Sequence, residues 1–485
     1  MNPTKLNIGS KDVINTLPEA LIHHILSFLP TREAASTSLL SRKWRYLFAF
    51  VPNLDFDDPL RMRADSLYNQ EKTELHRTFI DFVDRVLGLQ GKFPVNGFSL
   101  RCGNGVDDVV VTRWILKALE LGVTDLDLRI ALDCYDPLFP PQVLASKSLV
   151  RLRIGARNGT AYGVGSGLTI DVDKHVSLPK LKTLYIDSVM IGNQTDTCLD
   201  KLLSGCHVLE ELTLIGLLWF HWESCSLSVP TLKRLTLCVD DHHEWPKSVT
   251  FDAPALVYFE YSDTVALKYP KVNLDSLVEA SLRLKVGYDM VGDATNLLLG
   301  ISNVQILYLS ASTLEVLTFC CKAIPIFNNL TRLTIESNTE VGWESLPNLL
   351  NNCPNLKTLV FKGLQHKATD SCGNVCRCKA WENVPNCLSS SPVKALKIKL
   401  KFGGKFDSEL EQIKHFLESM PHLEKLTIYY DDASTDDSPV KVSEELHELP
   451  SVASPKCKIQ VISNTISLSF TVPSSSSMKW IAPLL

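Results

Sequence analysis

The pattern of apolar and polar positions divides the chain into a short N-terminal part and a long repetitive part. In the N-terminal part, apolar residues have the spacing of a helix. Apolar side chains recur every three or four residues over residues 17–29, which predicts an amphipathic helix starting at Pro18 and ended by Pro30. Thr31 and Ser41 are placed to cap two further short helices. Three short helices in about 45 residues are near the lower limit for a self-sufficient core. The pattern therefore predicts a docking module with an apolar stripe that a second protein covers.

From residue 149 onwards the apolar pattern repeats as Leu-x-x-Leu-x-Leu or a looser form of it. Successive copies are 21 to 37 residues apart, and a period in the twenties is typical of leucine-rich repeats, each giving one short strand. The copies are Leu149-Leu152-Ile154, Leu181-Leu184-Ile186, Leu209-Leu212-Leu214, Leu232-Leu235-Leu237, Leu256-Phe259-Tyr261, Leu277-Ala280-Leu282, Val304-Leu307-Leu309, Leu330-Leu333-Ile335, Leu356-Leu359-Phe361, Val393-Leu396-Ile398 and Leu423-Leu426-Ile428.

The segments between the repeats predict two kinds of connection. Segments 199–214, 347–361 and 414–428 each have a short helical run before the strand. Cys206 and Cys353 follow such runs and are interpreted as structural side chains that pack the helix against the core. Other repeats enter the strand through a proline, which ends any helix there. Only Asn338 follows its strand as the usual repeat asparagine does, so we expect an irregular array.

Side chains that alternate with the strand leucines should share the concave face of the array, opposite the core. This face mixes aromatic, basic and acidic residues, as a polypeptide-binding surface would, although a solvated face without a ligand is the alternative. The side chains predicted to contact a target there are Arg151, Arg153, Tyr185, Arg234, Tyr258, Tyr308 and Arg332.

Composition narrows the class of protein. The chain has 485 residues, a net charge of −5 and a pI of about 6.2, which argues against nucleic acid as a main partner. No apolar run approaches the roughly 18 residues that span a bilayer, and the N-terminus lacks a secretory apolar segment. We therefore expect a location in the cytoplasm, the nucleus or both, where the fourteen cysteines would be free thiols.

Two stretches resemble a known family. LPEALIHHILSFLPT (17–31), TSLLSRKWR (37–45) and VPNLDFDD (51–58) resemble the F-box of plant F-box/leucine-rich-repeat/FBD proteins. Residues 384–430, which read as a strand, a helix from about Ser408 to Ser419 and a second strand, resemble the FBD domain of the same family. In that family a further helix and strand follow, here SEELHEL and CKIQVIS.

The resemblance implies an α/β fold with six segments. A small three-helix F-box precedes an irregular leucine-rich-repeat solenoid with parallel strands and helices outside, and an FBD-type α/β cap ends it. The boundaries are 1–11 for a disordered N-terminus, 12–58 for the F-box, 59–365 for the repeats, 366–383 for a cysteine-containing loop, 384–463 for the FBD-type domain and 464–485 for an unassigned tail.

The resemblance also implies a function. Members dock through the F-box onto a Skp-type adaptor and through it onto a cullin, and the repeats hold a target protein for ubiquitination. No residue of the chain would then be catalytic, and no cofactor, nucleic acid or membrane is implied. Carried over by position, the adaptor contacts are Leu17, Pro18, Leu21, Ile25, Leu26, Leu29, Leu39, Leu40 and Trp44, some of which must instead pack within the module.

Two alternatives and one possible metal site accompany this prediction. The repeats could bind a small molecule that completes the target surface, or the protein could be a repeat scaffold that no longer recruits a ligase. Cys372, Cys376 and Cys378, with His366 nearby and Cys387 beyond, suggest a zinc site superficially. Because structural zinc usually requires paired Cys-x-x-Cys spacings, we predict free thiols and no metal there.

Overall fold

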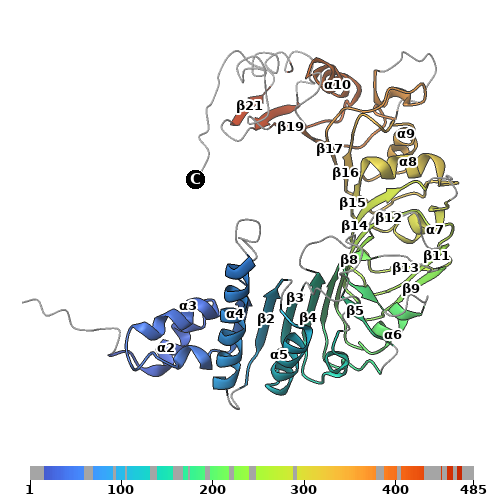
Figure 1. Cartoon of the computed structure of the whole chain (residues 1–485). Coiled ribbons are helices and arrows are strands. Elements are labelled where there is room, and N and C mark those ends of the chain that lie inside the picture. The colour runs from blue at the N-terminus through green and yellow to red at the C-terminus, as the bar shows by residue number, and fades with distance from the viewer. Residues whose placement is uncertain are drawn as a thin grey trace, which may run out of the picture. The chain divides into compact units, whose positions relative to one another are not determined.

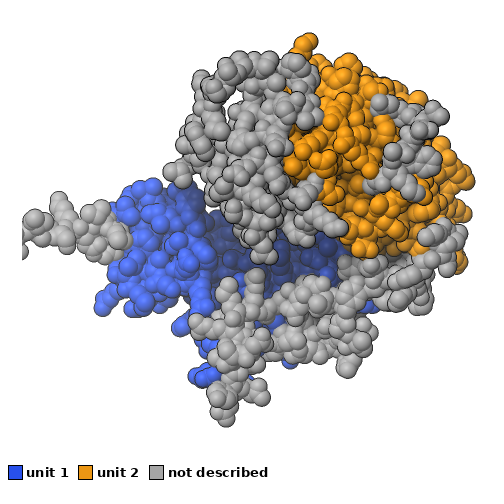
Figure 2. Space-filling view, turned by 90° about the horizontal axis from the view of Figure 1, so that it is seen from above, with its two compact units in different colours: residues 1–217 blue, residues 218–485 orange. Residues whose placement is uncertain are grey.

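The computed structural model divides into two compact units, residues 1–217 and residues 218–485 (Figure 2). It describes residues 16–58, 69–90, 94–103, 106–130, 139–156, 168–172, 175–191, 197–217, 223–239, 247–287, 292–377, 387–400, 406–430, 449, 456–462 and 467–471. The predictions for residues 1–11 and most of SEELHEL fall outside these ranges. In the described part of the chain, no helix is both long and apolar enough to cross a membrane.

Unit 1 begins with the helical module, which packs on the first strand of a sheet. Its elements are α2 (Glu19–Leu26), α3 (Thr31–Ser36), the 3-10 helices η1 (Thr37–Leu39) and η2 (Leu47–Phe50), and strand β1 (Asn53–Asp57). Two of the predicted helices are present. The third is replaced by turns and η2, because the backbone N–H groups here bond to carbonyl groups three residues back, as Leu47 N does to Trp44 O at 3.4 Å.

The predicted cap at Thr31 is wrong. Helix α3 has Pro30 in the capping position without a side-chain bond. The Thr31 hydroxyl, which is 1% exposed, instead accepts a hydrogen bond from the backbone N–H of Asp55 at 2.7 Å. Thr31 therefore joins the helical module to β1 rather than closing its own helix.

The rest of unit 1 is a parallel sheet with helices on one side (Figure 1). Its strand order is β1-β2-β3-β4-β6-β8, with Leu54, Phe98, Leu126, Leu152, Leu184 and Leu212 in one row of paired positions. The elements are α4 (Asn69–Gln90), β2 (Gly97–Cys102), α5 (Asp108–Glu120), β3 (Asp125–Ile130), η4 (Pro141–Ala145), β4 (Arg151–Ala156), β5 (Thr169–Ile170), β6 (Thr183–Asp187), β7 (Met190–Ile191), α6 (Cys198–Ser204) and β8 (Glu211–Leu217).

Strands β2 and β3 extend the repeat array before its first predicted copy. Leu126 and Leu128 on β3, with Val123 just before the strand, are fully buried and have the spacing of the repeat motif. The corresponding positions at β2 are Phe98 and Leu100 on the strand and Val95 just before it. The signal was thus present in the sequence, but valine and phenylalanine in place of leucine made it weaker.

Unit 2 continues the same design in the order β10-β12-β14-β15-β16-β17-β18-β19-β20-β21. Its elements are β9 (Ser224–Ser228), β10 (Arg234–Val239), β11 (Ser248–Asp252), β12 (Tyr258–Thr264), β13 (Val272–Asn273), β14 (Glu279–Lys285), α7 (Thr295–Gly300), β15 (Ile306–Leu309), α8 (Ala311–Phe319), β16 (Arg332–Glu336), α9 (Leu346–Asn351), β17 (Thr358–Lys362), η5 (Gly373–Val375), β18 (Ala395–Lys399), α10 (Phe406–Ser419), β19 (Lys425–Tyr429), β20 (Lys458–Ile462) and β21 (Ser467–Thr471).

Each of the eleven predicted repeat motifs coincides with a strand in one of the two strand orders given above. The predicted helical connections are confirmed as α6, α9 and α10. Repeats that enter through proline carry short strands instead, and β9, β11 and β13 form a second parallel sheet. Cys206 and Cys353 are at most 1% exposed, and burial raises the pKa of each thiol to about 12. Asn338 accepts bonds from the backbone N–H groups of Glu340 and Val341.

The segment predicted to be an FBD-type cap extends the sheet of unit 2. Strands β18, β19 and β20 add to β17 in parallel. Strand β21, from the tail that the sequence left unassigned, pairs antiparallel with β20. The FBD assignment itself stays a prediction.

A buried hydroxyl on α8 makes a testable contribution to unit 2. Thr313 is 0% exposed, and its Oγ1 accepts a hydrogen bond from the backbone N–H of Leu284 at 2.8 Å. Thr313→Val leaves that N–H buried without its partner, so we expect a loss of about 1–3 kcal/mol in the free energy of unfolding. Urea unfolding followed by circular dichroism measures it. In the control Thr318→Val, the lost bond is to Leu314 of the same helix, and equal losses in both variants would contradict the assignment.

A buried carboxyl on α10 predicts a pH dependence. Glu409 is 4% exposed, and burial raises its pKa to about 7, although the N–H of Leu364 donates to it. A carboxyl whose pKa is higher in the folded state binds more protons when folded, so its contribution to stability is full below its unfolded pKa and declines as the pH rises to about 7. Glu409→Gln should flatten the decline of the unfolding midpoint between pH 5 and pH 7.5; parallel profiles would exclude this role for Glu409.

Candidate functional site

Helix α2 has a buried and an exposed apolar side. Ile22 and Leu26, four residues apart, are 0% exposed and form the core of the module. Leu21 and Ile25 point away from that core and are 49% and 43% exposed, and Phe28, three residues on, is 73% exposed. Leu21 and Ile25 share one helix face, and Phe28 follows in the turn after α2, so the three form an exposed apolar stripe.

The module is fixed to the rest of unit 1 by hydrogen bonds between side chains and backbone groups, which hold the stripe outward. Besides the bond from Thr31 to β1, the side-chain amide of Gln90 on α4 donates to the carbonyl of Ala49. Within the module itself, Lys43 donates to the carbonyl of Leu17. The exposed apolar side chains are therefore presented by a supported scaffold, which lowers the entropic cost of binding a partner.

A second exposed apolar pair lies after α3. Leu39 is 88% exposed and Leu40 is 55% exposed. Together with the stripe and Tyr46, they account for six of the fourteen large exposed apolar side chains in the described part of the chain, all within residues 21–46. Such a concentration marks an interaction surface rather than the usual scatter of single apolar residues. We call Leu21, Ile25, Phe28, Leu39 and Leu40 the apolar surface.

The nine predicted adaptor contacts separate by burial. Pro18, Leu21, Ile25, Leu39 and Leu40 are exposed, Leu17 and Leu29 are half-buried, and Leu26 and Trp44 are buried. An adaptor role for these residues stays a prediction, but Leu26 and Trp44 already pack inside the module. Phe28 was not among the nine, although its position seven residues after Leu21 could have placed it on the same face.

On the open face of unit 1, basic side chains are paired with acidic neighbours. Arg151 contacts Asp125 on the adjacent strand at 2.7 Å, and Arg101 lies within 4.0 Å of three aspartates. The hydroxyl of Tyr185 donates to Asp187 at 3.2 Å. Arg153 is exposed on the same face, directly across from Tyr185 in the strand register.

On the open face of unit 2, tyrosine rings lie under arginine side chains. The guanidinium of Arg234 lies 4.2 Å from the ring centroid of Tyr258, whose hydroxyl donates to Glu260. Arg283 lies 4.7 Å from the ring centroid of Tyr308.

The Tyr308 hydroxyl donates to Glu336 at 2.5 Å. Burial, followed by this bond, raises the pKa of Tyr308 to about 12, so the phenol stays a donor at neutral pH. Arg332 is exposed beside this network, two positions before the residue that pairs with Tyr308.

All seven predicted target contacts therefore reach the open face of the sheets. Arg151 and the three tyrosines contact acidic partners, and Arg234 stacks on Tyr258, so the face is mixed in charge rather than a basic stripe. A surface of tyrosine and arginine with balanced charge suits a protein ligand, since these residue types are enriched in protein interfaces.

The two sides of α2 should respond differently to substitution. Leu26→Asp places a charge in the core of the module, so we expect it to unfold that module. Ile25→Asp, one residue away on the exposed side, should change the free energy of unfolding by no more than about 0.5 kcal/mol. Hydrogen exchange of residues 16–58 in the full chain measures both, and unchanged protection in Leu26→Asp would show that the core is placed incorrectly.

Comparison with known proteins agrees with both regions. The F-box domain model matches residues 14–55, and the model described as FBD-associated F-box protein At5g56370, LRR repeats, matches residues 111–286. The chain is 67% identical to the putative F-box/LRR-repeat protein At3g59230 of Arabidopsis thaliana, over 99% of this chain and 100% of the relative.

Two further Arabidopsis thaliana relatives are similar over nearly their whole length. Identity is 54% to F-box/LRR-repeat protein At3g59210, over 97% of this chain and 98% of the relative. It is 50% to putative F-box/FBD/LRR-repeat protein At3g59240, over 94% and 90%. With an F-box that presents an apolar surface and a repeat sheet with one open face, the chain belongs to the F-box/LRR-repeat family and has the protein-interaction role of an F-box protein.

Proposed function

We propose that this protein is the substrate-recognition subunit of a cullin-based, SCF-type ubiquitin ligase. The F-box binds a Skp-type adaptor, the adaptor links it to a cullin, and the open face of the repeats binds the target protein. The observation that carries this proposal is the apolar surface on an F-box that is otherwise packed and supported. Covering one large apolar side chain contributes on the order of 1.5–3 kcal/mol, so five of them can form the centre of a stable interface.

The repeat face supports a target that is a polypeptide. Arg151, Tyr185, Tyr258 and Tyr308 contact neighbouring acidic groups, and these contacts fix their positions before binding. Preorganised side chains lose less rotamer entropy on association. The bound target would be ubiquitinated because it is held near a conjugating enzyme, and proximity of this kind requires no catalytic residue in the receptor.

The proposal includes a location in the cytoplasm, the nucleus or both. These are reducing compartments, in which buried cysteines such as Cys206 and Cys353 stay thiols. Each of these thiols donates a hydrogen bond to a backbone carbonyl of the preceding helix. The packing of both side chains therefore requires no disulfide bond.

The apolar surface gives a direct test of adaptor binding. We expect Leu39→Asp and Leu40→Asp to lower the affinity for purified Skp-type adaptor at least about tenfold, because a carboxylate must then be desolvated in the interface. Ile326→Asp is the matched control, since Ile326 is 58% exposed and lies in unit 2. Pull-down and calorimetry of the full chains measure the effect. Wild-type affinity in the Leu39 and Leu40 variants would place the interface elsewhere.

The ligase role needs a second measurement. The full chain mixed with adaptor and cullin should co-elute as one assembly, and Leu39→Asp should elute apart from it. If the wild type binds adaptor but never enters the cullin assembly, the protein is a repeat scaffold rather than a ligase receptor.

A further inference from the structure

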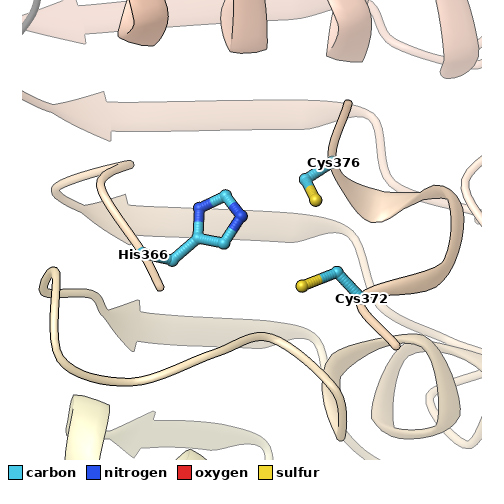
Figure 3. A group of neighbouring side chains, drawn as sticks. All are labelled: His366, Cys372 and Cys376. Atoms are coloured by element: carbon cyan, nitrogen blue, oxygen red, sulfur yellow. The ribbon is translucent and has the colours of Figure 1, made fainter. Parts of the chain in front are cut away.

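The connection between β17 and β18 brings three metal-ligand side chains together. His366, Cys372 and Cys376 each offer one ligand atom, and these atoms lie within 4.8 Å of one another. Figure 3 shows the two sulfur atoms on the same side of the connection, with one ring nitrogen of His366 turned toward them. A tetrahedral zinc ion, with bonds of about 2.3 Å to sulfur and 2.0–2.1 Å to nitrogen, holds such atoms about 3.5–3.8 Å apart. The three ligand atoms would therefore need to move only slightly closer together to bind zinc.

The histidine is oriented as a ligand. Its Nδ1 lies 3.1 Å from the carbonyl oxygen of Leu364, and because a carbonyl can only accept, Nδ1 carries the proton. Nε2 is then the nitrogen with a lone pair to offer. Metal-bound histidines are commonly fixed in this way, with the second ring nitrogen donating to a backbone carbonyl.

The ring of His366 is also held in place by its surroundings. It stacks on Trp343, with ring centroids 3.9 Å apart and planes 12° from parallel. Trp343 is 0% exposed, and its indole N–H donates to the hydroxyl of Ser337, which in turn donates to the carbonyl of Gln365. This chain of contacts returns to the residue before His366, so the imidazole cannot turn without breaking it.

The cysteines are buried and share one turn of the chain. Cys372 is 2% exposed and Cys376 is 4% exposed, on either side of η5. Gly373 between them has a φ of 62°, a left-handed conformation that suits glycine and turns the chain so that both sulfurs face His366. The Cys372 sulfur is hydrogen-bonded to Cys376, His366 and Thr369. Two buried thiols held against an imidazole form a ligand set that zinc prefers.

The connection also reaches α10 through its backbone. Gln412 donates to the carbonyl of Val375 at 2.7 Å, and His415 donates to the carbonyl of Asn374 at 2.8 Å. A metal bound at the cluster would close a ring from His366 to Cys376 and hold this docked turn to the end of β17.

We propose that His366, Cys372 and Cys376 bind one zinc ion, which fastens the β17–β18 connection against α10. Binding releases the thiol protons to solvent. Three protein ligands leave one tetrahedral position for a further donor. The sequence predicted no metal because the cysteines lack paired Cys-x-x-Cys spacings. It placed His366 nearby, but only the fold shows the ligand atoms of His366, Cys372 and Cys376 within 4.8 Å of one another. The site is independent of the proposed ligase role.

The test uses the full chain, purified without a histidine tag under reducing conditions. We expect close to one zinc ion per chain in the wild type by elemental analysis, and at least about tenfold less in His366→Ala, Cys372→Ser and Cys376→Ser. The matched control is Cys387→Ser. Cys387 is also buried and bonds to Asn374 within the same turn, yet it lies outside the cluster, so this variant should retain its zinc.

A second measurement does not depend on the folding of variants. Titration of zinc-free wild type with Co²⁺ should produce thiolate-to-cobalt absorption that saturates at one equivalent. Chelation should increase hydrogen exchange in residues 364–377 but not in β14 and β15. Absence of both zinc and cobalt absorption in the wild type would overturn the proposal. So would zinc that persists in all three ligand variants.

Discussion

The architecture depends on one constraint: every strand of the parallel sheets must bury the same face. The row that contains Leu126, Leu152, Leu184 and Leu212 is buried on strand after strand. Parallel pairing keeps these positions in register, so a repeat stabilises its neighbour by extending one continuous core. The side chains of the opposite face contact one another and do not contribute to the core. That face is therefore available for binding.

The same constraint explains what the sequence predicted well. Spacing alone located eleven strands, the helices α6, α9 and α10, and the face on which Arg151, Tyr185 and Tyr308 lie, because each follows from which positions must be buried. It missed β2 and β3, where Phe98 and Val123 replace leucine, and it missed α4 and α5, which belong to no motif. The sequence also could not predict which apolar residues of the F-box are buried. Leu26 and Ile25 are equally apolar neighbours, and only the packing of α2 against η2 decides that the first is core and the second is surface.

The F-box and the repeats present surfaces of opposite character, one apolar and one polar. The module is too small to bury all its apolar side chains, so Leu21 and Leu39 remain in solvent and favour association with a partner. The repeat face holds polar groups that already satisfy one another, as Arg234, Tyr258 and Glu260 do. A ligand must compete with those pairs, so recognition there depends on complementary shape and charge rather than on apolar area. A general partner and a specific target fit these two surfaces respectively.

In a repeat protein, long connections between strands have the fewest contacts with the core to stabilise them. Ordering each residue of the backbone costs about 1–2 kcal/mol, and other repeats recover this through a helix or a short paired strand beside the core. The described part of the β17–β18 connection has only η5. It is held by buried Leu364 and Val375, by the bonds from Gln412 and His415 to its carbonyls, and by the stack of His366 on Trp343. A metal bond within such a turn contributes far more per residue than an added apolar contact, since apparent binding free energies of structural zinc reach about 10–16 kcal/mol. A repeat without a covering helix gains most from it, and this is where the cysteines and the histidine converge.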